Sequence, residues 1–285
     1  METTDPVMSE DLCSVVIPTR NRRELLEEAV RSVLEQRRVS VECVIVDDGS
    51  DEPLERWDDP RVRVVGHEVP RGPAAARNTG LRHARGRYVS FLDDDDRYLP
   101  TRLASATEHI GPGIAVVCWS RAMGGTARRG RLLYGDEFDH IFDEATPQIG
   151  TITLWRDGCP EFDEGLPLNE DVEWWLRVAE KYRFLTVPMH LHLFREHEGP
   201  RITDRHLARL TASWQLIEMQ ADYFASHPRA LAFRLRRMGL IAVGAGLDGE
   251  AVAYFGRSFL VRPGIRPAAH LLRALRRATI RKVIS

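Results

Sequence analysis

Short apolar runs alternate with longer amphipathic segments in the first part of the chain, up to Trp119. Valine, isoleucine and aromatic residues dominate the runs, as they do in strands, and the segments between them repeat apolar positions at helical spacing. Runs that are apolar without alternation indicate a sheet covered on both faces. The pattern therefore predicts an α/β fold with a doubly wound, mostly parallel sheet. Its strands are expected at 14–17, 41–46, 62–65, 88–92 and 114–119, and its helices at 24–35 and 73–85.

The second part of the chain has a different pattern. Residues 121–164 are rich in glycine, arginine and acidic residues and have little periodicity, which is typical of a loop-rich insertion, here with a strand near 148–155. A helix at 170–182 and a strand at 184–194 follow. After residue 203 only helical patterns remain, at 207–224, 230–243, 250–260 and 268–283. We therefore expect a flexible leader at 1–11, a domain at 12–202 with halves 12–120 and 121–202, and a helical region at 203–285.

Polar residues directly follow three of the predicted strands. The first strand ends in PTRNR (18–22), the second in VDDGSDE (46–52), and the strand at 88–92 in four consecutive aspartates, Asp93 to Asp96. The carboxyl ends of parallel strands share one edge of a sheet, where ligands bind. Adjacent carboxylates repel one another, and a hard cation with oxygen ligands would remove that conflict. The run predicts a metal site, with a solvated acidic turn that caps the next helix as the alternative.

Composition and charge argue against several classes of protein. The net charge of −2, from 40 basic and 42 acidic residues, argues against a nucleic-acid-binding protein. The 4 cysteines lie far apart and lack the Cys-x-x-Cys spacing of zinc or redox sites. The acidic N-terminus has no apolar signal region, and no apolar stretch approaches membrane-spanning length. We therefore expect a cytoplasmic protein with reduced thiols.

Three further patterns resemble functional motifs: a glycine-rich stretch, a pair of histidines and a basic C-terminal stretch. VGAGLDG (243–249) matches a dinucleotide-binding fingerprint, but no strand–helix–strand unit with a later acidic residue surrounds it, so we expect a turn between helices. His190 and His192 alternate on one strand without a third ligand, which indicates a structural role. The basic amphipathic stretch 262–282 either packs on the domain or contacts an anionic membrane surface at the inner face, and both alternatives stay open.

Five blocks of the sequence resemble one known family. They are SVVIPTRNR (14–22), VIVDDGS (44–50), ARNTGLRHARGRYVSFLDDDD (76–96), FDEGLPLNEDVEWWLR (162–177) and FREHEGPRIT (194–203). In this order and spacing they resemble the inverting nucleotide-sugar glycosyltransferases of family 2. The resemblance implies an A-type glycosyltransferase fold and a metal-dependent hexosyl- or N-acetylhexosaminyltransferase, with UDP as the usual donor nucleotide and Mg²⁺ or Mn²⁺ as cofactor. It also implies a nucleotide-sugar half at 12–120 and an acceptor half at 121–202.

The same resemblance assigns a donor site to the first two blocks and to the helix before the aspartates. Pro18 and Thr19 would line the pocket of the nucleotide base, and Asp48 would hydrogen-bond the base. Many relatives have tyrosine where this chain has Arg20, whose guanidinium could stack on the base instead. Arg77 would bring a cation to the same crevice, with a structural Arg–Asp salt bridge as the alternative.

The aspartate run corresponds to the Asp-x-Asp element of the family. The resemblance makes Asp95 the principal metal ligand, and it gives Asp93 and Asp94 supporting contacts to the ribose or the donor sugar. Asp96 is expected to cap a following helix. The run is thereby interpreted as the anchor of the donor diphosphate.

The last two blocks supply the expected reactive groups. Asp171 matches the general base of the family, which takes the proton of the acceptor as the new bond forms. Glu170 is adjacent, and like-charge repulsion would make one of the two carboxylates a stronger base. Helix capping at Asn169 is an alternative that is compatible with this role. Arg195 and His197 would contact the diphosphate or the metal.

Two other functions stay open from the sequence. A silent nucleotide-sugar-binding or partner-recruiting module on the same fold would show no turnover. A nucleotidyltransferase would need a glycine- and arginine-rich phosphate loop after the first strand, where PTRNR contains no glycine. The expected partners are a nucleotide-sugar donor and an acceptor that is a polysaccharide, a lipid carrier, a protein or a small natural product. No nucleic acid is expected, and a homodimer stays open.

Overall fold

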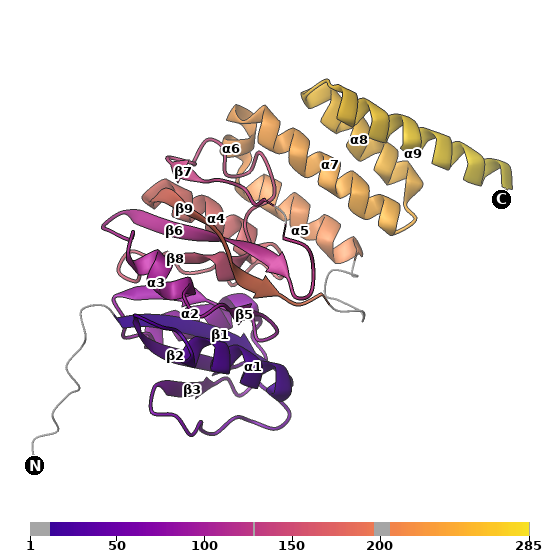
Figure 1. The fold of residues 1–285 in the computed structure, drawn as a ribbon. Helices are drawn as coiled ribbons and strands as arrows, with labels where there is room; N and C mark the ends of the chain where they lie inside the picture. The colour runs from indigo at the N-terminus through magenta and orange to yellow at the C-terminus, as the bar shows by residue number, and fades with distance from the viewer. Residues whose placement is uncertain (1–11, 128, 197–205, 285) are drawn as a thin grey trace, which may run out of the picture. The chain divides into compact units, whose positions relative to one another are not determined.

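The computed structural model describes residues 12–127, 129–196 and 206–284 of the chain, which forms two compact units (Figure 1). The first unit contains the described residues of Met1–Glu137, Pro147–Gly165 and Arg177–Glu196. The second contains those of Phe138–Thr146, Leu166–Leu176 and His197–Ser285. Each unit has its own apolar core.

A 9-stranded sheet is the centre of the first unit (Figure 1). Its strands lie side by side in the order β3 (Val62–Gly66), β2 (Ser40–Asp47), β1 (Leu12–Thr19), β4 (Tyr88–Phe91), β8 (Ile152–Trp155), β6 (Ile114–Ala122), β9 (Arg183–Phe194) and β5 (Arg97–Tyr98). The short β7 (Tyr134–Gly135) pairs with β9. The first four strands are parallel, β8 runs antiparallel between β4 and β6, and β6 and β9 are again parallel.

Helices cover both faces of the parallel part of the sheet. Odd-numbered residues of β1, such as Val15, pack with Leu26 and Val30 of α1 (Arg23–Leu34) in one core cluster. The next residue, Val16, points to the other face, because side chains alternate along a strand. There it lies against Gly80 of α2 (Pro73–His83). This arrangement confirms the predicted α/β fold class.

The register of the parallel strands decides which loops meet. Thr19, the last residue of β1, lies opposite Asp47, the last residue of β2. Val16 lies opposite Phe91, the last residue of β4. The segments that follow β1, β2 and β4 therefore leave the sheet at one edge, which brings PTRNR, VDDGSDE and the aspartate run together as expected.

Most of the predicted elements of the first unit are confirmed, and the short ones were missed. The predicted strand at 148–155 is a 3₁₀ turn (Ile149–Thr151) followed by β8. The sequence patterns predict neither β5 nor β7, and the helix expected directly after Asp96 begins only at Arg102, as α3 (Arg102–Thr107). These three elements are only 2, 2 and 6 residues long. Elements of that length carry too few residues to show a period.

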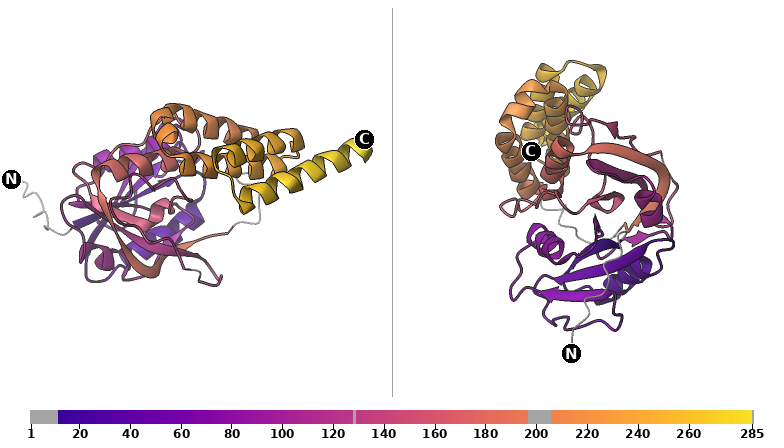
Figure 2. Two further views of the ribbon diagram at one scale, coloured as in Figure 1. Left: turned by 90° about the horizontal axis from the view of Figure 1, so that it is seen from above. Right: turned by 90° about the vertical axis from the view of Figure 1, so that its left-hand side faces the viewer.

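The second unit is helical, as predicted for the C-terminal region. It contains the first part of α4 (Glu170–Lys181), and then α5 (His206–Met219), α6 (Ala221–Ser226), α7 (Pro228–Gly244), α8 (Asp248–Val261) and α9 (Ile265–Ile284). Residues of α7, α8 and α9 share one core, and these helices lie side by side (Figure 2). The helix predicted at 207–224 breaks at Gln220 into two. None of the described helices is long and apolar enough to cross a membrane.

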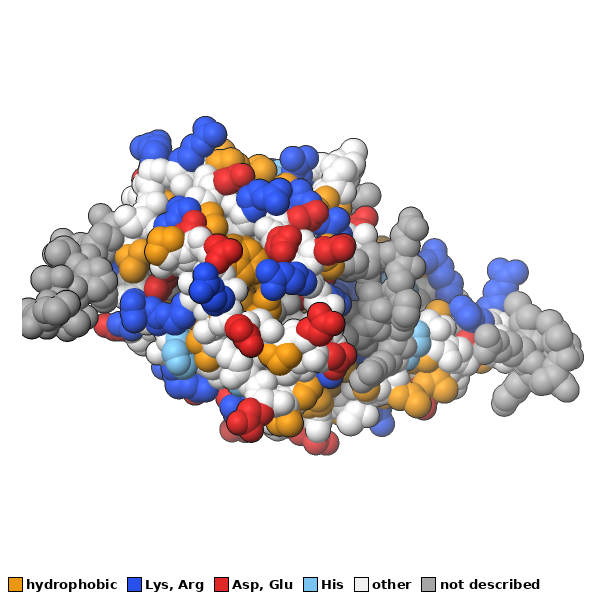
Figure 3. Space-filling view, turned by 90° about the horizontal axis from the view of Figure 1, so that it is seen from below, with side chains coloured by type: hydrophobic (Ala, Val, Ile, Leu, Met, Phe, Trp, Pro, Cys, Tyr) orange, Lys and Arg blue, Asp and Glu red, His pale blue; other side chains and the backbone are white. Residues whose placement is uncertain are grey.

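Charged side chains of both signs are interspersed over the described part of the surface drawn in Figure 3. Interspersed charges keep the local field small, since opposite charges screen one another.

Candidate functional site

The loops after β1 and β2 are fastened to each other. Asn21 adopts a left-handed backbone (φ 56°), and its side chain donates to Asp51 Oδ2 at 3.0 Å and accepts from the Asp51 amide at 2.8 Å. Its own backbone amide donates to Ser50 Oγ at 2.9 Å. These bonds hold the two loops as one rim, in which Pro18 is partly exposed and Arg20 is exposed.

Asp94 and Asp95 share one arginine at this rim. Arg22 Nη1 lies 3.2 Å from Asp94 Oδ1 and 3.1 Å from Asp95 Oδ2. Thr19 Oγ1 donates to Asp94 Oδ2 at 2.8 Å. Burial raises the pKa of Asp94 to about 6, against the opposing effects of the Thr19 hydrogen bond and the Arg22 charge. Arg22 is thus the counter-charge that lets two adjacent carboxylates lie together.

Asp93 points to a different cation. Its Oδ1 accepts from Arg77 Nη2 at 2.9 Å, and the Arg77 side chain is buried and lies 5.4 Å above the ring of Phe162. The side chain of Asp93 is 41% exposed, whereas that of Arg77 is 7% exposed. The structure therefore contains the Arg–Asp salt bridge that was the alternative for Arg77, and this bridge leaves part of the Asp93 side chain exposed.

The side chain of Asp96 is buried and does not cap a helix. Its Oδ1 accepts from the backbone amide of Arg195 at 3.0 Å, and its Oδ2 lies 3.0 Å from His192 Nε2. The expected cap was wrong because β5, not a helix, begins at Arg97. His192 is fully buried, in line with the structural role expected for it.

Arg195 is held by α1. Arg195 and Arg97 both donate to Glu28 Oε2, and the hydrogen bond from Arg97 lowers the pKa of Glu28, with both arginine charges acting in the same direction. The Arg195 Nε donates to the backbone oxygen of Asp95 at 3.3 Å. Arg195 thus lies against the aspartate run, and its expected contact with the diphosphate or the metal stays a prediction. His197 falls outside the described residues.

Asp48 is bound by the chain itself. Its Oδ1 accepts from the Arg71 amide at 2.8 Å and lies 2.7 Å from His67 Nδ1, and its Oδ2 accepts from the Gly72 amide at 2.8 Å. Gly72 has φ 93°, a conformation that glycine adopts without strain. The carboxylate therefore fixes the loop before α2, a role that the sequence did not indicate.

The second unit contains the proposed base. Glu170 and Asp171 are the first two residues of α4, directly after Asn169, whose backbone is left-handed (φ 65°). Asp171 Oδ1 accepts from the Val172 amide at 2.8 Å, and the Asn169 carbonyl accepts from the Glu173 amide at 2.9 Å. Carboxylates in the first turn also interact favourably with the helix dipole. Helix initiation and an acidic function at 170–171 are thus compatible.

A buried arginine of the second unit lies near Asp171. Arg234 of α7 is buried and lies 4.7 Å above the ring of Phe142, and its Nε and Nη2 have no hydrogen-bond partner among the described residues. Burial lowers the pKa of Arg234 to about 9; the charge of Arg237 lowers it further, and Asp171 opposes the shift. Sequence patterns did not single out Arg234, since one arginine in an arginine-rich helix carries no signal.

Trp174 and Trp175 follow Asp171 by one turn. Both side chains are fully buried and meet edge to face at 5.9 Å. Neither ring is therefore open to stack on a sugar.

The chemistry of the aspartate run fits a divalent cation that arrives with a phosphate ligand. Among the described residues, no three His, Cys, Asp or Glu side chains are grouped to hold a metal ion. Mg²⁺, however, often takes only one or two protein carboxylates and fills its other positions with substrate phosphates and water. Asp95, whose side chain is 18% exposed, and its neighbours offer such hard oxygen ligands at the sheet edge.

Comparison with curated proteins finds glycosyltransferases. The chain is 29% identical to glycosyltransferase RC0461 of Rickettsia conorii over 192 residues, which cover 61% of this chain and 31% of the relative. It is 32% identical over 100 residues to WfgD of Escherichia coli, a UDP-Glc:α-D-GlcNAc-diphosphoundecaprenol β-1,3-glucosyltransferase, covering 34% of this chain and 40% of WfgD. The chain thus spans less than half of the length of these relatives.

The fold has a counterpart among solved structures. The mannosyltransferase PcManGT of Pyrobaculum calidifontis, solved with GDP-Man and Mn²⁺, superposes with a TM-score of 0.60 at 21% identity, over 94% of this chain and 80% of that protein. At this identity the similarity shows the fold, an A-type glycosyltransferase fold. The model of the family described as Glycosyl transferase family 2 matches residues 14–153, the part of the chain that carries PTRNR, VDDGS and the aspartate run. Residues 14–153 therefore form a domain of glycosyltransferase family 2.

Proposed function

We propose that this protein is a metal-dependent, inverting glycosyltransferase that moves a sugar from a nucleoside diphosphate, most readily UDP, to an acceptor hydroxyl or amine. The observation that carries the proposal is the cluster of Thr19, Arg22 and Asp93–Asp95 at one sheet edge inside the family domain. WfgD is named for a UDP-sugar donor, and PcManGT was solved with a nucleotide sugar and Mn²⁺. Both support a nucleoside diphosphate donor.

The nucleoside would lie on the rim formed by the loops after β1 and β2. Pro18 and Thr19 border it, and the exposed guanidinium of Arg20 is free to stack on a base. Asp48 Oδ1 already meets the Arg71 amide and His67 Nδ1, and Oδ2 accepts only from the Gly72 amide; since a carboxylate oxygen has two lone pairs, Oδ2 keeps capacity for one more donor from the base. The rim thus offers one stacking group and one acceptor.

The diphosphate would lie over the aspartate run. Asp95 would be the principal metal ligand, with Asp93 and Asp94 beside it. A bound Mg²⁺ or Mn²⁺ would stabilise the negative charge that develops on the leaving diphosphate. Arg77 and Arg195 hold Asp93 and the backbone of Asp95 in place, and both bring positive charge toward the same group.

Direct displacement needs a base for the acceptor proton, because a hydroxyl is a poor nucleophile at neutral pH. We assign this role to Asp171, at the start of α4, with Glu170 beside it. The proton of the acceptor would pass to an Asp171 oxygen while the bond to the anomeric carbon forms and the bond to the diphosphate breaks. One displacement at that carbon inverts its configuration.

Replacing Asp171 with Asn tests the proposal. The amide keeps the shape but cannot take the proton, so we expect transfer to fall by roughly a thousandfold or more, while donor affinity changes little. Transfer is measured by release of UDP with an acceptor panel, and donor affinity by calorimetry with UDP and Mn²⁺. Asp157→Asn, at a carboxylate that is 81% exposed and lies outside the cluster, is the matched control. Unchanged turnover in the Asp171 variant would refute the assignment of the base.

A thermal-shift screen separates the proposal from a non-catalytic module. UDP, GDP, TDP and their sugars are tested with and without Mn²⁺, since a ligand that binds only the folded state raises the melting temperature. Stabilisation by a nucleotide sugar together with Mn²⁺-dependent hydrolysis or transfer supports the enzyme. Stabilisation without any turnover, over all donors and acceptors tried, would leave only the binding module.

A further inference from the structure

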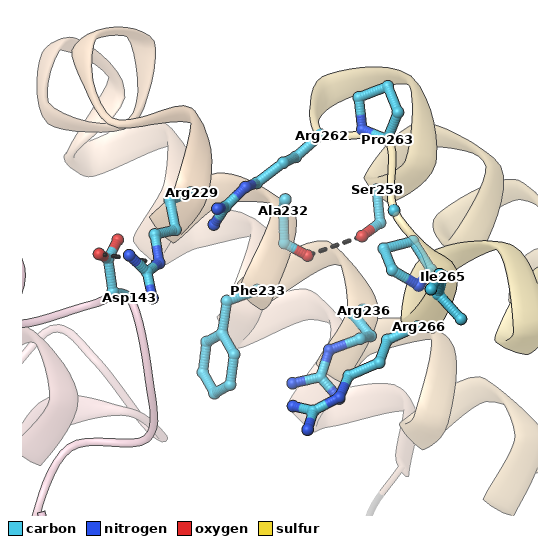
Figure 4. A pocket seen from close by; sticks show the side chains of 12 residues that line it. Asp143, Arg229, Ala232, Phe233, Arg236, Ser258, Arg262, Pro263, Ile265 and Arg266 are labelled. Atoms are coloured by element: carbon cyan, nitrogen blue, oxygen red, sulfur yellow. Dashed lines mark hydrogen bonds and ion pairs between the residues drawn. The ribbon is translucent and has the colours of Figure 1, made fainter.

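A cavity of about 370 Å³ lies within the second unit, between α7, the end of α8 and the start of α9 (Figure 4). Small-molecule sites commonly measure about 300–1,000 Å³, so the cavity has room for a small ligand. Four of its 12 lining residues are arginines: Arg229, Arg236, Arg262 and Arg266. We call it the arginine cavity.

The described residues balance only part of the positive charge that lines the arginine cavity. Asp143 is the one carboxylate in the lining, and Arg229 Nε already lies 3.2 Å from it. No described residue forms an ion pair with the side chains of the other arginines, Arg236, Arg262 and Arg266. From Pro228 onward the sequence has only two acidic residues, Asp248 and Glu250, and Asp248 lies 3.1 Å from Arg277.

Two of these arginines lie against each other. Figure 4 shows the guanidinium groups of Arg236 and Arg266 side by side at the wall of the cavity. Burial lowers the pKa of Arg236, and the charges of Arg266 and Arg237 lower it further. Like charges at close range raise the free energy of the folded protein unless an anion lies between them.

The rest of the lining is suited to an anion as well. Helix α9 begins at Ile265 without an acidic residue in its first turn, and the first amides of a helix have no intrahelical partner. The Ser258 hydroxyl is already used, since it donates to the Ala232 carbonyl at 2.8 Å. The remaining wall is apolar, with Phe233 and Pro263. The cavity thus presents donors and positive charge, with few free acceptors.

We propose that the arginine cavity binds a phosphate or diphosphate group, presented by a soluble phosphate compound or by a phospholipid headgroup. Arginine is the side chain that binds phosphate oxygens in pairs, and several arginines around one group give both affinity and orientation. A phosphate would lie between Arg236 and Arg266 and remove their repulsion. This site belongs to the second unit and is independent of the donor site proposed above.

The test uses the full chain and inorganic pyrophosphate as the probe, with EDTA present and ionic strength matched by NaCl. Binding is measured by calorimetry and by thermal shift. We expect Arg236→Gln/Arg266→Gln to lose at least tenfold in pyrophosphate affinity, because two charge-assisted contacts disappear. The control is Arg273→Gln/Arg276→Gln, which removes the same charge from exposed positions of α9 outside the cavity. The melting temperature of the cavity variant without ligand should equal or exceed that of the unmodified chain, which excludes misfolding as the cause.

A second arm identifies the source of the phosphate. Flotation with vesicles of phosphatidylcholine, with and without phosphatidylglycerol, is compared for the same three proteins. Loss of pyrophosphate binding in the cavity variant alone supports a soluble ligand, and loss of binding to the anionic vesicles in that variant alone supports a headgroup. If the cavity and control variants behave alike in both arms, or if the unmodified chain binds neither probe, the proposal is overturned.

Discussion

Arg22 shows how single side chains make the aspartate run possible. Two neighbouring carboxylates, Asp94 and Asp95, lie within 3.2 Å of the same guanidinium nitrogen. Burial of Asp94 would otherwise favour its protonated form. Arg22 thus occupies the position of a counter-ion, and the side chain itself is 48% exposed and able to move away. A metal ion and Arg22 should therefore compete for the same oxygens.

Replacing Arg22 with Met tests this competition. Without the guanidinium, the two carboxylates repel each other and gain more from a cation, so we expect Mn²⁺ alone to bind several-fold more tightly. Free Mn²⁺ is measured by electron paramagnetic resonance during titration. Arg20→Met, in the same loop but at a side chain with no ion pair to a carboxylate of the described residues, should leave Mn²⁺ affinity unchanged. Weaker Mn²⁺ binding in the Arg22 variant would mean that Arg22 orients the carboxylates and does not compete.

The burial of the Arg234 side chain leads to a second prediction at the residue scale. A buried charge with unpaired nitrogens costs free energy, and an apolar side chain of similar length is often better tolerated. We expect Arg234→Met to keep or raise the melting temperature but to lower transfer, because the substitution removes the positive charge that lies near Asp171. Differential scanning fluorimetry and the transfer assay are compared with those of Arg237→Met, its exposed neighbour. A lower melting temperature together with unchanged transfer would assign Arg234 a purely structural role.

At the scale of elements, the contact of α2 with β1 is decided by one glycine. A Cβ added at Gly80 would lie 2.2 Å from Val16 Cγ1, closer than atoms can approach, so α2 can lie on the sheet only without a side chain there. This contact positions Arg77, one turn earlier in the helix, beside the aspartate run. The packing of a helix and the geometry of the site are therefore linked.

Gly80→Ala should destabilise the protein by about 1–3 kcal/mol through overpacking. The control is Gly256→Ala in α8, where an added Cβ meets nothing within 4 Å and the better helix propensity of alanine should stabilise by up to about 1 kcal/mol. Val16→Ala in the Gly80→Ala background makes room for the methyl group and should recover part of the loss. Urea unfolding measures all three. Equal effects at Gly80 and Gly256 would contradict the clash.

Element prediction from the sequence succeeded where a segment was long enough to show a period. The strands at 14–17 and 41–46 and the helices at 24–35 and 170–182 are all observed, as β1, β2, α1 and α4. β5 was missed because its two residues are placed by hydrogen bonds to β9, about a hundred positions later. Long-range pairing of this kind leaves no local pattern.

The site was predictable only in part, for a similar reason. The motifs located the aspartate run and the polar ends of β1 and β2, because their place behind a strand is a local property. They did not reveal Glu28, which joins Arg97 and Arg195, since its role depends on where α1 meets two distant segments. They also missed the backbone amides that hold Asp48, which only the folded loop supplies.

At the scale of the whole molecule, we propose one phosphate-binding site in each unit. In the first unit the proposed site is acidic: carboxylates at a sheet edge would bind a metal ion, and the metal ion would bind a diphosphate. In the second unit the proposed site is basic: Arg236, Arg262 and Arg266 have no ion-pair partner among the described residues and would bind the phosphate directly. The two sites should therefore respond in opposite ways to removal of the metal.

Hydrogen exchange measured by mass spectrometry separates the two sites in one experiment. UDP with Mn²⁺ should slow exchange in peptides that cover the ends of β1, β2 and β4, and EDTA should abolish this protection. Pyrophosphate with EDTA should instead slow exchange around 262–268, at the start of α9. In Arg236→Gln/Arg266→Gln the first pattern should persist and the second should vanish. One common set of protected peptides for both ligands would show that the chain has a single phosphate site, and the arginine cavity would then need no ligand of its own.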